Sequence, residues 1–225
     1  MGAFELSRVV IAGLSGDGGK TLVSLGLVGA LRKAGLRVSA FKKGPDFIDA
    51  AWLARASGQV ARNLDTFLMP EEAVVRSVAR SAGHCDIAVT EGNRGLFDGF
   101  DYQGSHSTAQ LAKLISSPVV LVVNTTKVTR TAAALVKGCI ALDPDLPLVG
   151  VVLNRVGTVR QEKLIRRAIE KEVGIPVYAL GGITPDNVRD VAGTGADGVA
   201  GISMFIDEDS LGRLMKVLQE GVSRK

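Results

Sequence analysis

The sequence predicts an α/β protein with a mainly parallel sheet and helices on both faces. Short, wholly apolar runs alternate with longer amphipathic segments, and glycines stand where several helices should end. The expected strands are residues 9–12, 38–41, 87–89, 119–123, 148–153, 177–180 and 199–202. The expected helices are residues 20–33, 71–82, 108–115, 129–142, 159–172, 186–192 and 209–220.

Each element follows from its residue pattern. The strand segments are apolar at every position, which fits strands buried on both faces; the first reads Val-Val-Ile-Ala. Gly35, Gly83 and Gly174 stand at expected helix ends, where a residue without Cβ can turn the chain. Right-handed crossovers follow from strand twist. No linker rich in Pro, Gly or Ser divides the chain, so we expect a single domain over residues 1–225.

The composition limits the classes of partner. Lys and Arg are scattered and the net charge is only +4, which predicts no nucleic-acid partner and suits a few contacts to anionic ligands. The apolar runs are too short to span a membrane, and residues 1–8 do not read as a signal peptide. Cys85 and Cys139 provide neither a disulfide framework nor a CxxC metal site, so we expect free thiols in the cytoplasm.

The strongest motif is the glycine-rich segment 13–21 between the first strand and the first helix. Its glycines let successive backbone N–H groups turn toward one anion, and the helix N-terminus adds the positive end of its dipole. The lysine should reach the β and γ phosphates of ATP, and the threonine should offer its hydroxyl to Mg²⁺. The leading glycine stands at position 13, not at position 14 as strict Walker spacing requires. The expected nucleotide-binding residues are Gly16, Gly18, Gly19, Lys20 and Thr21.

Acidic residues follow the second and third expected strands. In a parallel sheet these loops lie beside the phosphate loop, at the carboxyl edge where ligands bind. Mg²⁺ prefers hard oxygen ligands, so Asp46 and Glu91 are the candidate metal ligands. Asp49 and Asp98 are expected to orient groups of the substrate.

With these loops, the sequence from about residue 8 to residue 174 resembles the synthetase domain of cobyrinic acid a,c-diamide synthase. That family lies in the dethiobiotin synthetase-like group of P-loop proteins. Besides the phosphate loop, five segments in order carry the likeness: residues 41–49, 62–66, 91–92 with 95–99, 107–109 and 153–156. Members of the family activate a carboxylate of a corrin precursor with ATP, and ammonia attacks the acyl phosphate.

The resemblance implies a role for each candidate. It assigns Lys20 and Thr21 to phosphate and Mg²⁺, Asp46 and Glu91 to Mg²⁺, Lys42 to the transferred phosphoryl group, Asp49 and Asp98 to the carboxylate, and Asn154 to the adenine edge. Phe47 stands where the family often has Tyr, so a hydroxyl contact is missing there. In this group the carboxylate pocket can form partly across a homodimer.

Two features depart from the family pattern. The chain is expected to lack the glutaminase domain that releases ammonia in these synthases. Residues 175–225 instead resemble the last βα units of thiamine phosphate synthase, a TIM barrel, which suggests an engineered chimera. By that likeness Gly182, Ile202 and Ser203 would form a second phosphate site.

The sequence bears on three alternatives to a diamide-synthase domain. A dethiobiotin synthetase has similar loops, but the segments 44–46 and 96–99 speak against it. A chimera that only folds, with residual nucleotide affinity, stays open. A thiamine phosphate synthase fails because the first strands of the barrel and its diphosphate loops are absent from the sequence.

Overall fold

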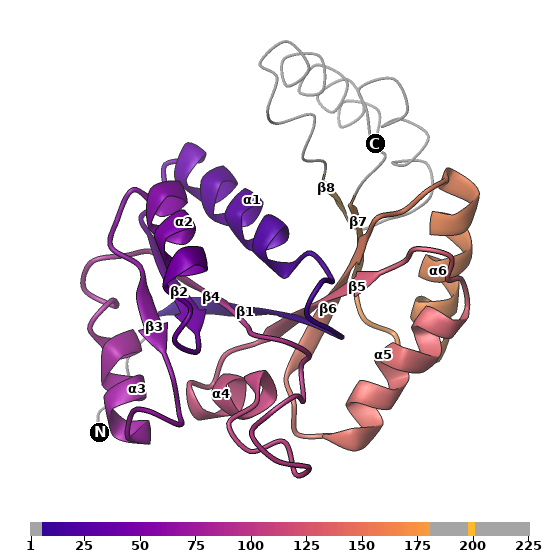
Figure 1. The fold of residues 1–225 in the computed structure, drawn as a ribbon. Coiled ribbons are helices and arrows are strands. Elements are labelled where there is room, and N and C mark those ends of the chain that lie inside the picture. The colour runs from indigo at the N-terminus through magenta and orange to yellow at the C-terminus, as the bar shows by residue number, and fades with distance from the viewer. Residues whose placement is uncertain (1–5, 181–197, 201–225) are drawn as a thin grey trace. The chain divides into compact units, whose positions relative to one another are not determined.

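The computed structural model describes residues 6–180 and 198–200 (Figure 1). The chain divides into two compact units. The first unit consists of residues 1–122 and 145–149, and the second of residues 123–144 and 150–225. Strands β5 (Val119–Asn124) and β6 (Leu148–Asn154) contribute residues to both units.

The first unit is built on a parallel sheet in the order β3-β2-β4-β1-β5. Its other strands are β1 (Ser7–Gly13), β2 (Val38–Lys43), β3 (Arg62–Leu64) and β4 (Ile87–Glu91). Strands β1 and β4 each have a neighbouring strand on both sides. Residues 10–13 of β1 and residues 88–91 of β4 are buried, as the unbroken apolar runs predict. The register places Glu91 of β4 beside both Ile11 of β1 and Lys42 of β2.

Four helices cover this sheet: α1 (Lys20–Lys33), α2 (Phe47–Ser57), α3 (Glu71–Ala79) and α4 (Thr108–Leu114). Figure 1 shows α1 and α2 on one face and α3 and α4 on the other. Helices α1 and α2 also contact each other. The predicted α/β class, a parallel sheet with helices on both faces, is therefore confirmed.

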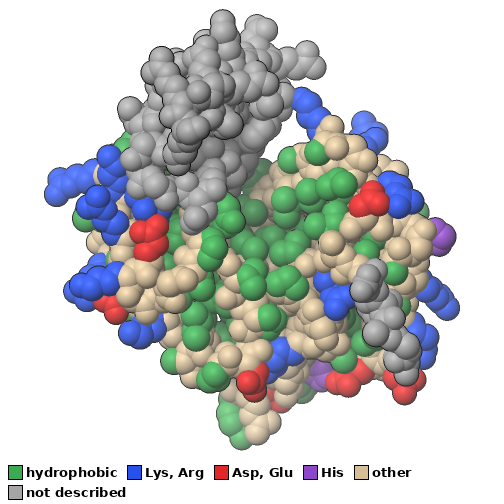
Figure 2. All heavy atoms as spheres, turned by 180° about the vertical axis from the view of Figure 1, so that it is seen from behind, with side chains coloured by type: hydrophobic (Ala, Val, Ile, Leu, Met, Phe, Trp, Pro, Cys, Tyr) green, Lys and Arg blue, Asp and Glu red, His purple; other side chains and the backbone are tan. Residues whose placement is uncertain are grey.

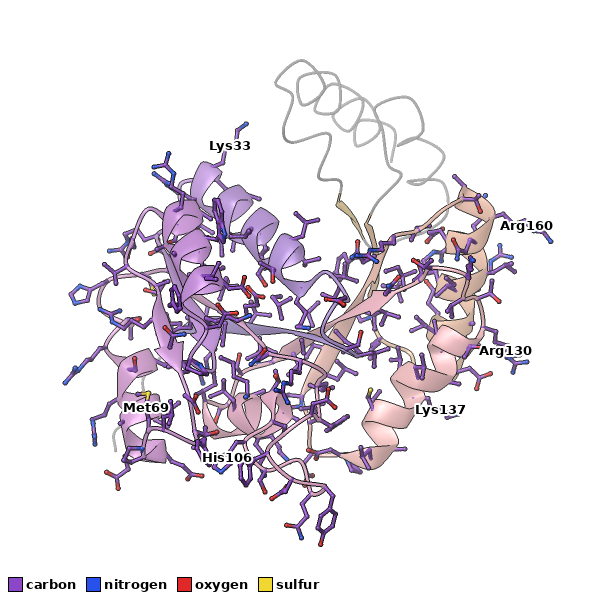
Figure 3. The ribbon with its side chains drawn as sticks, in the orientation of Figure 1. Lys33, Met69, His106, Arg130, Lys137 and Arg160 are labelled. Carbon is purple, nitrogen blue, oxygen red and sulfur yellow. The ribbon has the colours of Figure 1, made fainter. Side chains whose placement is uncertain are left out.

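The second unit contains α5 (Thr131–Leu142), α6 (Val159–Glu172), β7 (Val177–Leu180) and β8 (Gly198–Ala200). Strands β6, β7 and β8 pair in parallel, and α5 packs against α6. The buried Arg166 of α6 forms ion pairs with Glu162 at 3.0 Å and Glu170 at 2.8 Å. Arg130 and Lys137, labelled in Figure 3, project from the α5 side toward Glu172 of α6.

Two elements differ from the sequence-based expectation. Residues 47–57 form helix α2, for which the sequence predicted no helix. Its amphipathic pattern is blurred because Phe47, Ile48 and Trp52 lie exposed. The side chain of Asp46 caps the start of α2, and Gly58 ends it with φ 70°. Strand β3 has only three residues, too few to give a pattern. The helices expected at 186–192 and 209–220 lie outside the described residues.

Several smaller expectations can also be compared with the structure. Gly35 and Gly174 adopt the left-handed conformation after α1 and α6, whereas α3 ends at Ala79, before Gly83. Both cysteines are buried free thiols. No helix within the described parts of the chain has the length and apolarity needed to cross a membrane. Figure 2 shows Lys and Arg side chains spread around the visible face with Asp and Glu among them, in keeping with the scattered charges of the sequence.

Candidate functional site

The phosphate loop joins β1 to α1, as predicted. Its lysine bends back over the loop, because Lys20 Nζ donates to the carbonyl oxygen atoms of Ser15 at 2.6 Å and Gly16 at 3.2 Å. A Cβ at Gly13 would stand 3.0 Å from Lys20 Cγ, so a side chain there would press on the lysine. The displaced leading glycine thus has a structural reason: it makes room for the aliphatic part of Lys20.

Four polar side chains meet beside this loop, and we call them the Lys42 cluster: Thr21, Lys42, Asp49 and Glu91. Thr21 donates its hydroxyl hydrogen bond to Glu91 Oε1 at 2.6 Å. Lys42 Nζ lies 2.8 Å from the same oxygen and 2.7 Å from Asp49 Oδ2. The four residues come from α1, β2, α2 and β4, and the parallel arrangement of the strands brings them to one carboxyl edge.

Two charged members of the cluster are buried. The side chain of Glu91 is fully buried, and that of Lys42 is 3% exposed. Burial opposes the charge on Lys42, but hydrogen bonds to Asp49 and Glu91 outweigh it and raise the pKa of the ammonium group. Burial, assisted by repulsion from Lys42, lowers the pKa of Lys20. Lys42 is therefore a firmly held cation, and an anion bound beside Lys20 would favour the charged form of that lysine.

One atom of the cluster bears on metal binding. Glu91 Oε2 is buried and has no hydrogen-bond partner within the described residues, although its other oxygen is shared by Thr21 and Lys42. An unpartnered buried carboxylate oxygen is costly, and a hard cation would offset that cost. The donor set of one hydroxyl and one or two carboxylates fits Mg²⁺, which keeps several water ligands of its own.

Asp46 and Asp98 have structural contacts in addition to their predicted roles. Asp46 Oδ1 accepts hydrogen bonds from the backbone N–H groups of Ile48 and Asp49, both at 3.0 Å. Asp98 Oδ2 accepts from the Gly95 N–H at 2.8 Å. A Cβ at Gly95 would stand 2.8 Å from the carbonyl oxygen of Leu14, so this glycine lets the loop after β4 approach the phosphate loop. Because Asp98 is bonded to this same Gly95, its carboxylate belongs to the part of the loop that approaches the phosphate loop.

The remaining candidates belong to other parts of the chain. Asn154 belongs to the second unit, where its carbonyl oxygen accepts from the N–H and the hydroxyl of Thr125, both at 2.9 Å. Its side-chain oxygen accepts from the N–H of Arg155 at 2.9 Å. These bonds fix the backbone at the end of β6. The three residues of the expected second phosphate site, Gly182, Ile202 and Ser203, lie outside the described residues.

A comparison with protein families gives one match over most of the chain. The model described as "CobQ/CobB/MinD/ParA nucleotide binding domain" matches residues 9–193. The matched region includes the phosphate loop and every member of the Lys42 cluster. It also extends beyond residue 174, where the resemblance was expected to end.

Curated proteins with similar sequences have related names. A cobyrinate a,c-diamide synthase from Magnetococcus marinus is 44% identical over 174 residues, which are 77% of this chain and 37% of that protein. A hydrogenobyrinate a,c-diamide synthase from Streptomyces coelicolor is 48% identical over 77% of this chain and 36% of that protein. The cobyrinate a,c-diamide synthase of Archaeoglobus fulgidus is 41% identical over 78% of this chain and 39% of that protein. The chain thus spans little more than a third of the length of these relatives.

Solved structures share the fold at low identity. Chloroplast FtsY from Physcomitrella patens superposes with a TM-score of 0.58 at 19% identity, covering 78% of this chain and 58% of that one. FtsY from Elizabethkingia anophelis in complex with GDP superposes with a TM-score of 0.59 at 13% identity. The match covers 79% of this chain and 57% of that one. These likenesses confirm a P-loop type α/β fold.

Proposed function

We propose a function that follows from the family, because this chain belongs to the CobQ/CobB/MinD/ParA nucleotide binding domain family. The proposed function is to bind Mg-ATP and to phosphorylate a carboxylate of a corrin precursor. The carboxylate oxygen attacks the γ-phosphorus, and ADP leaves. Ammonia then attacks the acyl carbon, phosphate departs, and a proton is lost as the amide forms. The observation that carries the proposal is the Lys42 cluster: a phosphate-loop hydroxyl joined to a buried carboxylate and a buried ammonium group.

The side chains of the site support phosphoryl transfer by charge and position. Lys20 lies over the loop whose N–H groups would hold the phosphates, and a polyphosphate would replace its contacts with the loop carbonyls. Lys42 keeps its positive charge and is oriented by Asp49 and Glu91, so it can stabilise the charge on the moving phosphoryl group. Asp49 and Asp98 are the residues proposed to position the incoming carboxylate.

Mg²⁺ would be held by Thr21 and Glu91, with Asp46 as the third proposed ligand. When bound, the ion would neutralise charge on the β and γ phosphates. The protein leaves one oxygen of Glu91 available for the ion. Lys42 binds Glu91 Oε1, whereas Glu91 Oε2 has no protein partner within the described residues. Asn154 is proposed to contact the adenine edge.

The class of substrate is inferred from the relatives, whose names specify cobyrinate or hydrogenobyrinate. This chain spans little more than a third of their length, so free ammonium supplies the ammonia in the test. A domain that only binds nucleotide, and a dethiobiotin synthetase-like ligase, are the competing interpretations.

The test combines binding with turnover. The protein is mixed with Mg-ATP, and its melting temperature is followed; then cobyrinate and ammonium are added, and ADP release is measured. We expect stabilisation by Mg-ATP through mass action and ADP release that needs both cobyrinate and ammonium. Lys20→Met should abolish the thermal shift and lower turnover by about a hundredfold or more, because a charge on the phosphates is lost.

Lys33→Met is the matched control, because Lys33 lies exposed at the far end of the same helix (Figure 3). It should leave both readouts unchanged. A thermal shift that survives Lys20→Met contradicts the phosphate site. Nucleotide binding without ADP release favours the pure binding domain, and turnover with a diamine and bicarbonate instead of cobyrinate favours the dethiobiotin synthetase interpretation.

A further inference from the structure

Gln161 is a polar residue of α6 that joins two loops of the second unit. Its Nε2 donates to the carbonyl oxygen atoms of Thr125 at 2.6 Å and Val128 at 2.8 Å, both in the loop after β5. Its Oε1 accepts from the N–H of Gly157 at 2.9 Å, in the loop after β6. The backbone N–H of Gln161 donates to the hydroxyl of Thr158, which caps α6, at 3.1 Å. One side chain therefore fastens both loops to the start of the helix.

These contacts require the chemistry of an amide. Two carbonyl oxygen atoms need donors and one N–H group needs an acceptor, and a neutral amide supplies both. A carboxylate in the same place would offer no donor to the carbonyls, and an ammonium group would offer no acceptor to Gly157. The three bonds thus fix the plane of the Gln161 amide and hold the two loops at one separation.

The two loops also meet at Asn154, the residue proposed for the adenine edge. The carbonyl oxygen of Asn154 accepts from both the N–H and the hydroxyl of Thr125, and Thr125 is fully buried. Gln161 binds the carbonyl group of the same threonine. A short chain of hydrogen bonds, from Gln161 through Thr125 to Asn154, therefore links α6 to the proposed contact with the base.

Each of the two loops contains a basic residue in the left-handed conformation. Lys127 has φ 56°, and Arg155 has φ 59°. This conformation is costly for a residue with a Cβ, and it persists where surrounding contacts impose it. Lys127 lies between the two residues whose carbonyl groups Gln161 binds, and the N–H of Arg155 donates to the side chain of Asn154 at 2.9 Å. The contacts of Gln161 thus support a loop shape that local backbone preferences disfavour.

We propose that Gln161 is the positioning residue of the adenine site. It holds the loops after β5 and β6 in the shape in which Asn154 contacts the base, and it does not touch the reacting atoms itself. This inference rests on the proposed function, which assigns Asn154 to the adenine edge. Loops that are held before binding lose less conformational freedom when the nucleotide binds. The affinity for ATP, and the preference for its base, should therefore depend on Gln161.

The test compares two ligands that share a triphosphate. Mg-ATP carries the base and inorganic tripolyphosphate with Mg²⁺ lacks it, and calorimetry measures the Kd of each. Gln161→Met keeps the length of the side chain but loses its three hydrogen bonds, so it should weaken ATP binding about tenfold and leave the affinity for tripolyphosphate unchanged. The preference for ATP over GTP should fall by a similar factor. In turnover the KM for ATP should rise while kcat stays at the wild-type value.

Arg160→Met is the matched control, because Arg160 is exposed and directly precedes Gln161 on the same helix (Figure 3). It should leave both dissociation constants unchanged. Gln161→Glu keeps an acceptor for the N–H of Gly157 but loses both donors, so it should share the ATP defect of Gln161→Met. Wild-type affinity for ATP in Gln161→Glu would contradict the part assigned to the two carbonyl contacts.

The outcomes separate this inference from the proposed function. If Gln161→Met binds ATP as tightly as wild type, or weakens ATP and tripolyphosphate by the same factor, Gln161 does not position the base site. The inference is then overturned, and the proposed function stands. If wild type binds tripolyphosphate as tightly as ATP, the inference fails together with the adenine contact of Asn154, but the phosphate site stands. If wild type binds neither ligand, the inference and the proposed function both fail. Unchanged affinity for tripolyphosphate in Gln161→Met shows that the variant is folded.

Discussion

Lys42 and Lys43 are adjacent lysines on one strand, both nearly buried, and they have opposite surroundings. Lys42 contacts two carboxylates within 2.8 Å, and its pKa is raised. Lys43 has no ion pair in the described part of the chain, and its pKa is lowered, chiefly by burial. The alternation of a β-strand is enough to separate them, because it directs one side chain to the α1–α2 face and the other to the α3–α4 face.

The difference indicates two uses of a buried charge. The charge of Lys42 is compensated inside the protein, so it contributes to the fold and stays in one position while a ligand reacts. Lys43 has no ion pair among the described residues, but its ammonium group is not one of the fully enclosed polar atoms, and Asp65 favours its charged form.

The largest expected effect is on stability. Lys42→Met leaves Glu91 as a buried carboxylate without a cation, so the free energy of unfolding should fall by about 3–5 kcal/mol. Lys43→Met removes an ammonium group that has no ion pair among the described residues, and should change the free energy of unfolding by less than about 0.5 kcal/mol. Urea unfolding of the two variants, which carry the same substitution one residue apart, measures the difference. Equal destabilisation would contradict the contrast between the two lysines.

The pH dependence of stability should show a smaller effect. The pKa of Lys43 in the folded protein lies below 10.5, its usual value, so the folded protein loses this proton before the unfolded chain does. Unfolding then takes up a proton, and stability from this group rises as the pH increases through the lowered pKa toward 10.5. The difference in unfolding free energy between wild type and Lys43→Met should therefore shift in favour of wild type as the pH rises through the lowered pKa toward 10.5.

The contribution of Lys42 to stability should change with pH in the opposite direction. Its pKa in the folded protein is raised, so its contribution is complete below pH 10.5 and is lost as the pH rises through the raised value. The difference between wild type and Lys42→Met should thus stay flat up to pH 10.5. A slope of the same sign in both differences would contradict the assigned pKa directions.

The sequence predicts the local parts of this molecule well. Continuous apolar runs mark most strands, and the glycine-rich segment marks the turn into α1. The meeting of Thr21 and Glu91, 70 positions apart, was also predictable, because parallel strands end at one edge. The roles assigned to these residues stay predictions.

The features that the sequence did not predict depend on which side chains are exposed and which residues they contact in the fold. Helix α2 escaped because Trp52 and its apolar neighbours face solvent, which hides the amphipathic period. The contrast between Lys42 and Lys43 also escaped, since a Lys-Lys pair looks the same at both positions until the strand face is known. The only usable signal was the alternation itself, which assigns neighbouring residues to opposite faces.

The smallest expected effect on stability is at Asp46. This residue has two candidate roles, as a helix cap and as a metal ligand. Its Oδ1 caps α2, and the sequence predicts it as a metal ligand. Asp46→Ala should lower the free energy of unfolding by about 1 kcal/mol, because the cap is lost. Serine caps a helix nearly as well as aspartate, so Asp46→Ser should keep the stability of wild type. It removes the carboxylate, however, so the Mg²⁺ concentration needed for half-maximal turnover should rise.

The two substitutions together separate the roles, because only the metal role requires the carboxylate. If Asp46→Ser unfolds like wild type and keeps the wild-type dependence on Mg²⁺, the residue is a helix cap and nothing more. The Lys42 cluster would then supply metal ligands from Thr21 and Glu91, with Asp49 as the nearest further carboxylate, since its Oδ2 lies 3.5 Å from the Thr21 hydroxyl. The face of the sheet that holds its lysine firmly would in that case also hold the metal entirely within the same four residues.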